Sequence, residues 1–123
     1  MGEPIPTEIR VRRAIARLEV DFDDWTRWSL PAEFLRVESP SAAVQGHTPY
    51  QKKIVAGKRD VGIAAVEPVG HYAIRIRFTD GHDTGIYSWN TLHRLGREQE
   101  ALWAAYLQAL AERGLSRDAG GRH

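Results

Sequence analysis

The sequence predicts a small α+β domain, with a mainly antiparallel sheet of about five strands, helices packed on one face of that sheet, and a C-terminal pair of helices. Two observations carry this prediction. Apolar and polar side chains alternate over residues 16–22 and 74–78, which is the period of a half-buried strand. Leu102, Tyr106 and Leu110 recur every fourth residue, as on one face of a helix.

Length and composition fit one domain. The chain has 123 residues, of which 42% are hydrophobic, enough for one core and too few for two. We expect the folded domain to span residues 11–115. Residues 1–10 contain two prolines and no periodicity, and residues 116–123 are rich in Gly, Arg and Asp, so both segments are predicted to be flexible.

The N-terminal elements follow from this alternation and from turn residues. A first strand is expected over residues 14–22, and a second over 25–30 pairs back on it as a hairpin, with two aspartates at the turn. Pro31 suits the first turn of a helix because its missing N–H would have no partner there. A short helix is therefore predicted over residues 32–36.

Residues 39–60 are predicted to be mostly loop, because glycines and a proline interrupt a segment with little periodicity. Short extended pieces are expected at 43–45 and 53–55. Long connections of this kind often carry function.

Three further strands are predicted over residues 61–65, 73–78 and 82–87. The turns between them are expected at residues 68–70 and at Asp80-Gly81.

Ser88 is a favourable N-cap for a helix through Leu95, which Gly96 would close. A second helix is predicted over residues 98–113. The four tryptophans lie on amphipathic elements, so we expect them to pack in the core and not to form a stacking surface for bases. They are Trp25, Trp28, Trp89 and Trp103.

Charge and composition narrow the function. The net charge is +1, with alternating signs, which disfavours nucleic-acid binding. Without cysteine, the chain can form no thiolate metal site. No apolar run approaches the length of a membrane span and no signal segment is visible, so a cytoplasmic protein without membrane contact is expected.

Two groups of residues could carry chemistry. Asp80, His82 and Asp83 form either a hydrogen-bonded turn, which we favour, or a weakly held iron or zinc site completed by His47 or His71. A basic stretch is expected to be solvated, with contact to a phosphate or an acidic partner as the alternative. It contains Lys52, Lys53, Lys58 and Arg59.

No catalytic set is recognisable. The stretch around Lys58 lacks the glycine and the Ser or Thr of a P-loop, because positions 52 and 59 hold Lys and Arg. None of Ser39, Ser41 and Ser88 lies in the Gly-x-Ser-x-Gly elbow of a hydrolase. We therefore do not expect an enzyme.

Five collinear segments are specific enough to suggest a family. They cover residues 30–42, 45–47, 57–61, 70–75 and 80–89, and the last reads Asp-Gly-His-Asp-Thr-Gly-Ile-Tyr-Ser-Trp. Together they resemble the DUF971 family, also called the gamma-butyrobetaine hydroxylase-like N-terminal domain. The resemblance implies a stand-alone, bacterial-type form without the oxygenase domain.

The resemblance also implies which positions of this chain correspond to a zinc site. In hydroxylases of this family the domain holds a structural zinc through three cysteines and one histidine, at positions that correspond to Ser39, Ser41, Val44 and His82. With three ligands replaced, no zinc is expected here. Other members are fused to ATPases that carry iron–sulfur clusters, which implies an accessory role.

Our first hypothesis is therefore a noncatalytic binding or adaptor module, accessory to iron–sulfur cluster maturation or to a partner oxygenase. The alternatives are a small metal-binding protein using His82 with Asp80 and Asp83, and phosphate or nucleic-acid binding by the basic loop 52–59. The expected contact surface consists of His47, Lys52, Lys53, Lys58, Arg59, Asp80, His82, Asp83, Tyr87 and Trp89.

Overall fold

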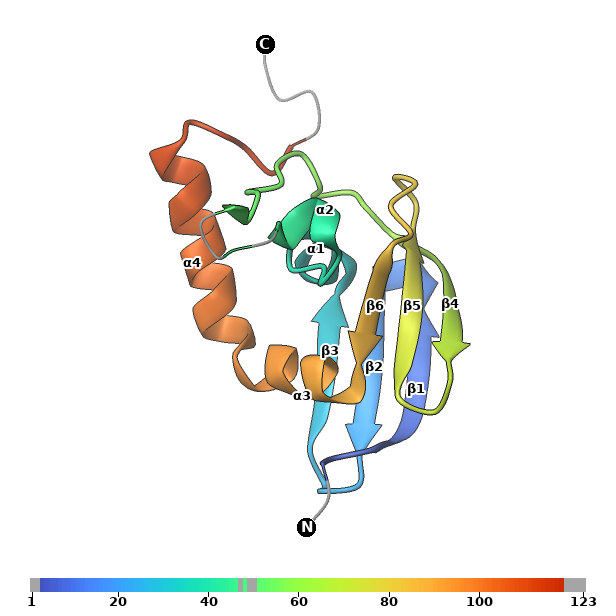
Figure 1. The fold of residues 1–123 in the computed structure, drawn as a ribbon. Coiled ribbons are helices and arrows are strands. Elements are labelled where there is room, and N and C mark those ends of the chain that lie inside the picture. The colour runs from blue at the N-terminus through green and yellow to red at the C-terminus, as the bar shows by residue number, and fades with distance from the viewer. Residues whose placement is uncertain (1–2, 47, 49–50, 119–123) are drawn as a thin grey trace.

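The fold was analysed in a computed structural model, which describes residues 3–46, 48 and 51–118. Its elements are β1 (Pro6–Arg12), β2 (Arg17–Phe22), β3 (Arg27–Pro31), α1 (Ala32–Val37), α2 (Ala42–Gln45), β4 (Ile63–Val69), β5 (Ala73–Phe78), β6 (Gly85–Ser88), α3 (Trp89–Arg97) and α4 (Gln99–Glu112), with a 3-10 turn at Arg13–Ile15. Figure 1 shows the strands side by side, with α3 across one end and α4 along one side. The predicted α+β class and the C-terminal helix pair are confirmed.

The strands form two antiparallel sheets of three strands, in the orders β1-β2-β3 and β4-β5-β6, where we predicted one sheet of about five. The extra strand is β1, which lies mostly in the segment predicted to be flexible. Pro6 made this segment look unlike a strand, although proline is tolerated at the first position of an edge strand. Ile9 and Val11 of β1 pack against the core. The folded part thus begins before residue 11.

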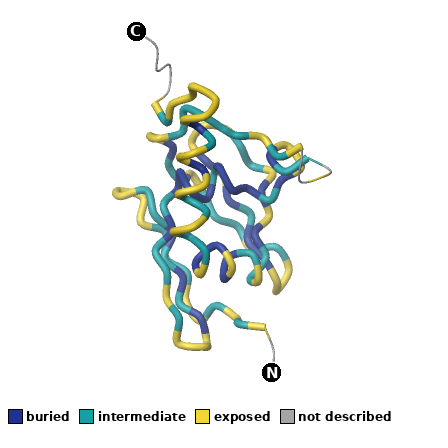
Figure 2. Tube along the Cα trace, turned by 90° about the vertical axis from the view of Figure 1, so that its left-hand side faces the viewer, coloured by how far each residue is buried: buried dark blue, intermediate teal, exposed yellow. Residues whose placement is uncertain are grey.

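One apolar cluster joins the two sheets, and α1 and α3 contribute to it. Figure 2 shows the buried stretches running through the middle of the molecule, with exposed residues at the hairpin ends. The cluster includes Leu18, Val20 and Leu30 from the first sheet, Ile74, Ile76 and Tyr87 from the second, and Phe34, Leu35, Leu92 and Leu95 from the helices. All of these side chains are nearly or completely buried.

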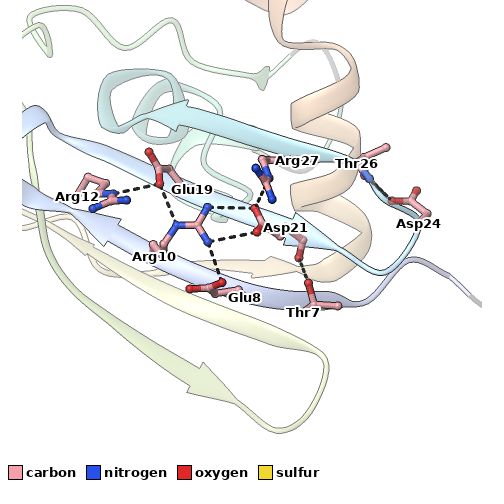
Figure 3. A network of polar contacts seen from close by, with 9 residues as sticks. All are labelled: Thr7, Glu8, Arg10, Arg12, Glu19, Asp21, Asp24, Thr26 and Arg27. Atoms are coloured by element: carbon pink, nitrogen blue, oxygen red, sulfur yellow. Dashed lines mark hydrogen bonds and ion pairs between the residues drawn. The ribbon is translucent and has the colours of Figure 1, made fainter.

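The opposite face of the first sheet carries a network of matched charges (Figure 3). Arg10 is its centre, with ion pairs to Glu8 (3.0 Å), Glu19 (3.0 Å) and Asp21 (3.1 Å). Hydrogen bonds from Arg10 lower the pKa of both Glu19 and Asp21. Solvent-facing pairs of this kind contribute little stability each, so we regard this face as a solvated surface.

Several element boundaries differ from the predictions because side-chain contacts decide them. Residues 43–45 belong to helix α2 and not to an extended piece, since the Ser41 hydroxyl caps the first turn by accepting from the Ala43 N–H (3.0 Å). Strand β2 begins at Arg17, after the 3-10 turn, and β4 continues through Pro68 to Val69. β6 begins only at Gly85.

Gly96 does not end helix α3, which continues to Arg97. The glycine lies against the ring of Trp28, where an added Cβ would come within 2.3 Å of a ring atom. The close approach of the helix to β3 therefore accounts for this glycine.

Three of the four tryptophans, Trp28, Trp89 and Trp103, pack against the core as predicted. The prediction is wrong for Trp25, which lies in the turn between β2 and β3 and is 96% exposed.

Backbone hydrogen bonds anchor the irregular segment between α2 and β4. The N–H groups of Gly57 and Arg59 donate to the carbonyls of Ser116 and Arg117, each at 2.9 Å. The Tyr106 hydroxyl donates to the Val55 carbonyl (2.6 Å). Residues 116–118, predicted to be flexible, thus take part in the fold, while residues 119–123 lie outside the described residues. Within the described part, no helix combines the length and apolar character needed to cross a membrane.

Candidate functional site

The Asp80-Gly81 turn connects β5 to β6. Gly81 N–H donates to the Phe78 carbonyl (3.0 Å), and Phe78 N–H donates to the His82 carbonyl (2.9 Å). The Asp80 carboxylate accepts from the His82 N–H (3.0 Å), a local bond that stabilises the turn. The turn predicted from these residues is present, and it places the His82 side chain beside the segment that follows α1.

Ser39, Ser41, His82 and Thr84 form a polar cluster where these two segments meet, which we call the serine–histidine corner. The Ser39 Oγ lies 2.9 Å from Nε2 of His82, and the Ser41 Oγ lies 2.8 Å from Oγ1 of Thr84. Both serines are buried, Ser39 completely. Gly85 allows this approach, because a Cβ there would be 2.6 Å from the Ser39 Oγ. Side-chain hydrogen bonds thus join segments that lie 43 residues apart.

The corner collects residues that the family resemblance led us to compare with zinc ligands. Ser39, Ser41 and His82 come together, and Val44, at the remaining position, is buried on α2. Hydroxyl groups and a valine offer no thiolate to a metal. The hydroxyls of Ser39 and Ser41 are instead hydrogen-bonded to His82 and Thr84. Among the described residues, no group of three or more His, Cys, Asp or Glu side chains is placed to hold a metal ion.

The described residues of the alternative metal site are not brought together in the structure. Oδ2 of Asp80 contacts Nε of Arg36 (2.8 Å) and Nζ of Lys58 (2.6 Å), two cations that would repel a metal ion. His71 lies in the turn between β4 and β5, at the other end of β5 from Asp80. His47 lies outside the described residues.

Burial and the neighbouring cations together set the protonation of the corner. Burial opposes ionisation of Asp80, but hydrogen bonds from Lys58, from the His82 N–H and from Arg36 outweigh it and lower the pKa to about 2. Burial, followed by the Arg36 charge, lowers the pKa of His82. His82 is therefore favoured in its neutral form. Nη1 of Arg36 is buried and has no hydrogen-bond partner in the described part of the chain.

The distance between Ser39 and His82 matches that of a nucleophile and its base. However, the serine is completely buried, and its Oγ already accepts a hydrogen bond from the Ser41 N–H (3.2 Å). A substrate could not reach this oxygen in the observed conformation. The pair therefore serves to hold the two segments together.

The basic stretch is largely paired with carboxylates. Lys52 Nζ lies 2.7 Å from Oε1 of Glu38, Lys58 pairs with Asp80, and Arg59 pairs with Asp118. Lys53 is exposed, and its side chain makes no ion pair with the described residues. The stretch thus presents less free positive charge than its sequence suggests.

Two aromatic residues expected on the contact surface lie elsewhere. Tyr87 is completely buried, its hydroxyl donates to the Leu35 carbonyl, and burial raises its pKa, so the prediction of a surface position is wrong. Trp89 is half-buried at the start of α3, and its Nε1–H donates to the His71 carbonyl (2.8 Å). It lies at the opposite end of the second sheet from the corner.

The structure also contains a hollow of about 780 Å³ that the sequence did not indicate. It lies between α1, the start of α4 and the segment after α4. Arg117 spans one side, with its guanidinium 5.2 Å from the ring centre of Trp103. No local motif marks this hollow, because its lining residues come from distant parts of the chain. They include Arg17, Phe34, Arg97, Trp103 and Arg117.

Comparison with known proteins shows similarity along most of the chain. The gamma-butyrobetaine hydroxylase-like N-terminal family matches residues 9–93. Two NMR solution structures are 45% and 42% identical, each with a TM-score of 0.82. They cover 95% and 96% of this chain and 92% and 88% of their own. A crystal structure of a protein of unknown function from Acidithiobacillus ferrooxidans, belonging to the DUF971 family, is 43% identical, with a TM-score of 0.63. It covers 74% of this chain and 91% of its own. No curated protein matches the chain.

Proposed function

We propose that this chain, which belongs to the gamma-butyrobetaine hydroxylase-like N-terminal family, is a noncatalytic protein-binding module. Its contact surface would be the outside of the serine–histidine corner and the loop around it. The hydrogen bond between Ser39 and His82 supports this proposal most directly. This hydrogen bond uses the serine hydroxyl and the imidazole to fix the segment after α1 to the β5–β6 turn. A segment that is already fixed loses less entropy when a partner binds.

The exposed groups around the corner suit a protein partner. Ala42 and Ala43 on α2 are exposed, and so are Thr84 and the side chains of Lys53 and Arg59. These groups combine apolar methyl groups with positive charge, which a partly apolar and acidic partner surface would complement. We therefore expect a partner surface that is partly apolar and carries acidic residues at its rim.

The family resemblance suggests the class of partner, either an ATPase that carries an iron–sulfur cluster or a separate oxygenase. In both cases the module would contribute binding and no chemistry of its own. The likeness of the domain to those proteins supports this assignment.

Site-specific photo-crosslinking tests the proposal. A photoreactive amino acid would replace Ala43 or Thr84 at the corner, and Arg12 on the charged face of the first sheet would serve as the control position. Each protein would be mixed with the purified iron–sulfur ATPase or 2-oxoglutarate oxygenase of the same cell. We expect adducts from the two corner positions only. Adducts from Arg12 alone, or from no position, would contradict the proposal.

The other two functions stay predictions that the geometry does not favour. Weakly held iron or zinc at His82 with Asp80 and Asp83 would give metal in elemental analysis of untagged protein. Phosphate or nucleic-acid binding by residues 52–59 would give a gel shift that weakens steeply with salt. The ion pairs of Lys52, Lys58 and Asp80 argue against both.

A further inference from the structure

The hairpin between β2 and β3 ends in a large apolar side chain that contacts little of its own chain. Trp25 is 96% exposed, whereas tryptophan side chains are highly buried on average. The other three tryptophans of the chain pack against the core. The indole of Trp25 therefore contributes almost no packing to the fold.

The backbone of Trp25 makes this residue type still less expected. Its φ is +71°, in the left-handed region that bulky residues rarely occupy and that glycine adopts readily. A glycine would fit this turn better and would expose no apolar surface. Neither local conformation nor packing accounts for the tryptophan, which points to a role outside the isolated chain.

Contacts of the neighbouring residue hold the turn in one shape. Oδ1 of Asp24 accepts hydrogen bonds from the N–H (3.0 Å) and the hydroxyl (2.5 Å) of Thr26. Oδ2 of Asp24 lies 2.8 Å from Nε2 of His93, a buried residue of α3. The Trp25 N–H donates to the Phe22 carbonyl (3.2 Å). The indole is thus presented on a fixed base, which lowers the entropy cost of binding.

The surroundings of the indole are apolar and acidic. Ile5 is 54% exposed and is joined to Asp23 by two hydrogen bonds, one in each direction (2.9 and 3.1 Å). Asp23 and Asp24 are exposed beside Trp25, and the nearest cation in the sequence, Arg27, is paired with Asp21 (3.2 Å). Carboxylates at the tip would repel the phosphates of nucleic acids and of anionic lipids.

We propose that the hairpin tip, defined as residues 22–26 with Ile5, is a second protein-binding site. In it the Trp25 indole enters an apolar pocket with a basic rim on a partner protein. The tip and the serine–histidine corner lie at opposite ends of the molecule (Figure 1). A module with both sites can hold two proteins at once. Binding at the hairpin tip does not require binding at the serine–histidine corner, so either proposal can fail without the other.

Affinity capture from native extract would compare the wild-type chain with Trp25→Gly, Trp25→Ala and the control Leu107→Ala. Leu107 is 39% exposed on α4, far from the tip in sequence. We expect at least one protein whose recovery falls about tenfold or more with both Trp25 variants and is unchanged with the control. Once purified, that protein should bind the wild-type chain saturably and the Trp25→Gly chain about tenfold or more weakly.

Fluorine NMR identifies the contact directly. In chain labelled with 5-fluorotryptophan, the Trp25 resonance is assigned by its loss in Trp25→Phe, and it should shift when the purified partner is added. Several results would overturn the proposal: equal recovery of all proteins by wild type and Trp25→Gly, a captured protein that does not bind when purified, or an unmoved resonance. A shift caused instead by phosphatidylcholine–phosphatidylglycerol vesicles or by single-stranded DNA would also overturn it.

Discussion

The guanidinium of Arg117 donates hydrogen bonds of 2.8 and 2.6 Å to the two carboxylate oxygens of Glu33, a residue 84 positions earlier in the chain. The Glu33 side chain is 7% exposed and that of Arg117 is 29% exposed. This pair fixes the segment after α4 onto helix α1, and it makes that segment a structural part of the domain.

Replacing Arg117 by Gln should destabilise the protein, because it leaves the buried Glu33 carboxylate without its partner. Breaking a fully buried pair costs about 3–5 kcal/mol, and we expect about 2–3 kcal/mol here since Arg117 is partly exposed. Urea unfolding measures the loss. Arg113→Gln, at an exposed arginine near the end of α4, should change stability by less than about 0.5 kcal/mol. Equal effects of the two substitutions would contradict the structural role of the pair.

Restoring thiolates at the serine–histidine corner should create a zinc site. In the triple variant S39C/S41C/V44C the three cysteines would join His82, and we expect about one zinc ion per chain by elemental analysis. Zinc bonded to sulfur at about 2.3 Å and to nitrogen at about 2.0 Å would require the corner to open slightly from the present 2.9 Å. Adding H82A to the triple variant should reduce zinc retention. Equal zinc content with and without His82 would show that the corner does not supply the fourth ligand.

The pKa of His82 predicts how stability changes with pH. Because the folded protein lowers this pKa, the unfolded chain binds the proton more readily. The contribution of His82 to the free energy of unfolding should therefore be complete above about pH 7. It should decrease as the pH falls below about 6.5, the pKa of histidine in the unfolded chain, and through the lower pKa of the folded protein. Urea titrations between pH 8 and 5 test this, with H82Q expected to show a smaller slope. Identical slopes for H82Q and wild type would refute the prediction.

Trp25→Gly should make the isolated protein more stable. Relief of the left-handed backbone would contribute about 1–2 kcal/mol, and the greater freedom of glycine in the unfolded chain offsets part of it. We expect a net gain of about 0.5–1 kcal/mol in urea unfolding. Trp25→Ala is the matched control, because it removes the indole and keeps a Cβ, so it should bring no such gain. A clear loss of stability in Trp25→Gly would mean that the indole packs after all.

Gly96→Ala should destabilise the domain, although alanine favours helices. The added Cβ would lie 2.3–2.6 Å from three atoms of the Trp28 ring, which forces α3 away from β3. Overpacking of this kind costs about 1–3 kcal/mol. Thermal or urea unfolding measures the change, and Arg94→Ala on the exposed side of α3 is the control. If both variants unfold alike, Gly96 is not required by packing.

Elements with strong local patterns could be predicted from the sequence. The alternation over residues 74–78 matches β5, and the four-residue spacing of Leu102, Tyr106 and Leu110 matches α4. Strand β1 was missed because its proline and the short N-terminal segment concealed the alternation of Ile9 and Val11. The sheet is divided because, in the described part of the chain, no strand of β1-β2-β3 pairs with a strand of β4-β5-β6, and no local pattern in the sequence shows which strands pair.

Contacts between distant segments could not be predicted from local patterns. Gly96 has the sequence signature of a helix end, and only the position of Trp28 shows why a glycine occurs there. The amphipathic pattern around Trp25 suggested burial, since the turn conformation that exposes it is invisible in the sequence. The meeting of Ser39 with His82 followed only from the family resemblance, and nothing pointed to Arg117 and Glu33.

The chain's apolar contacts are divided, since Val37, Tyr106 and Leu110 pack with residues 54–56 in a cluster separate from the one between the sheets. Among the described residues, Trp103 packs against both clusters. Leu102 and Trp103 tie the start of α4 to the main cluster, so we expect the rest of α4 and the irregular segment to open together as one cooperative unit while the sheets stay folded. Amide protons in that unit would then exchange with solvent through partial opening, and those of β2 and β5 only through global unfolding. Accessibility of the loop beside the corner would thus be governed by an equilibrium of smaller free energy than the stability of the whole domain.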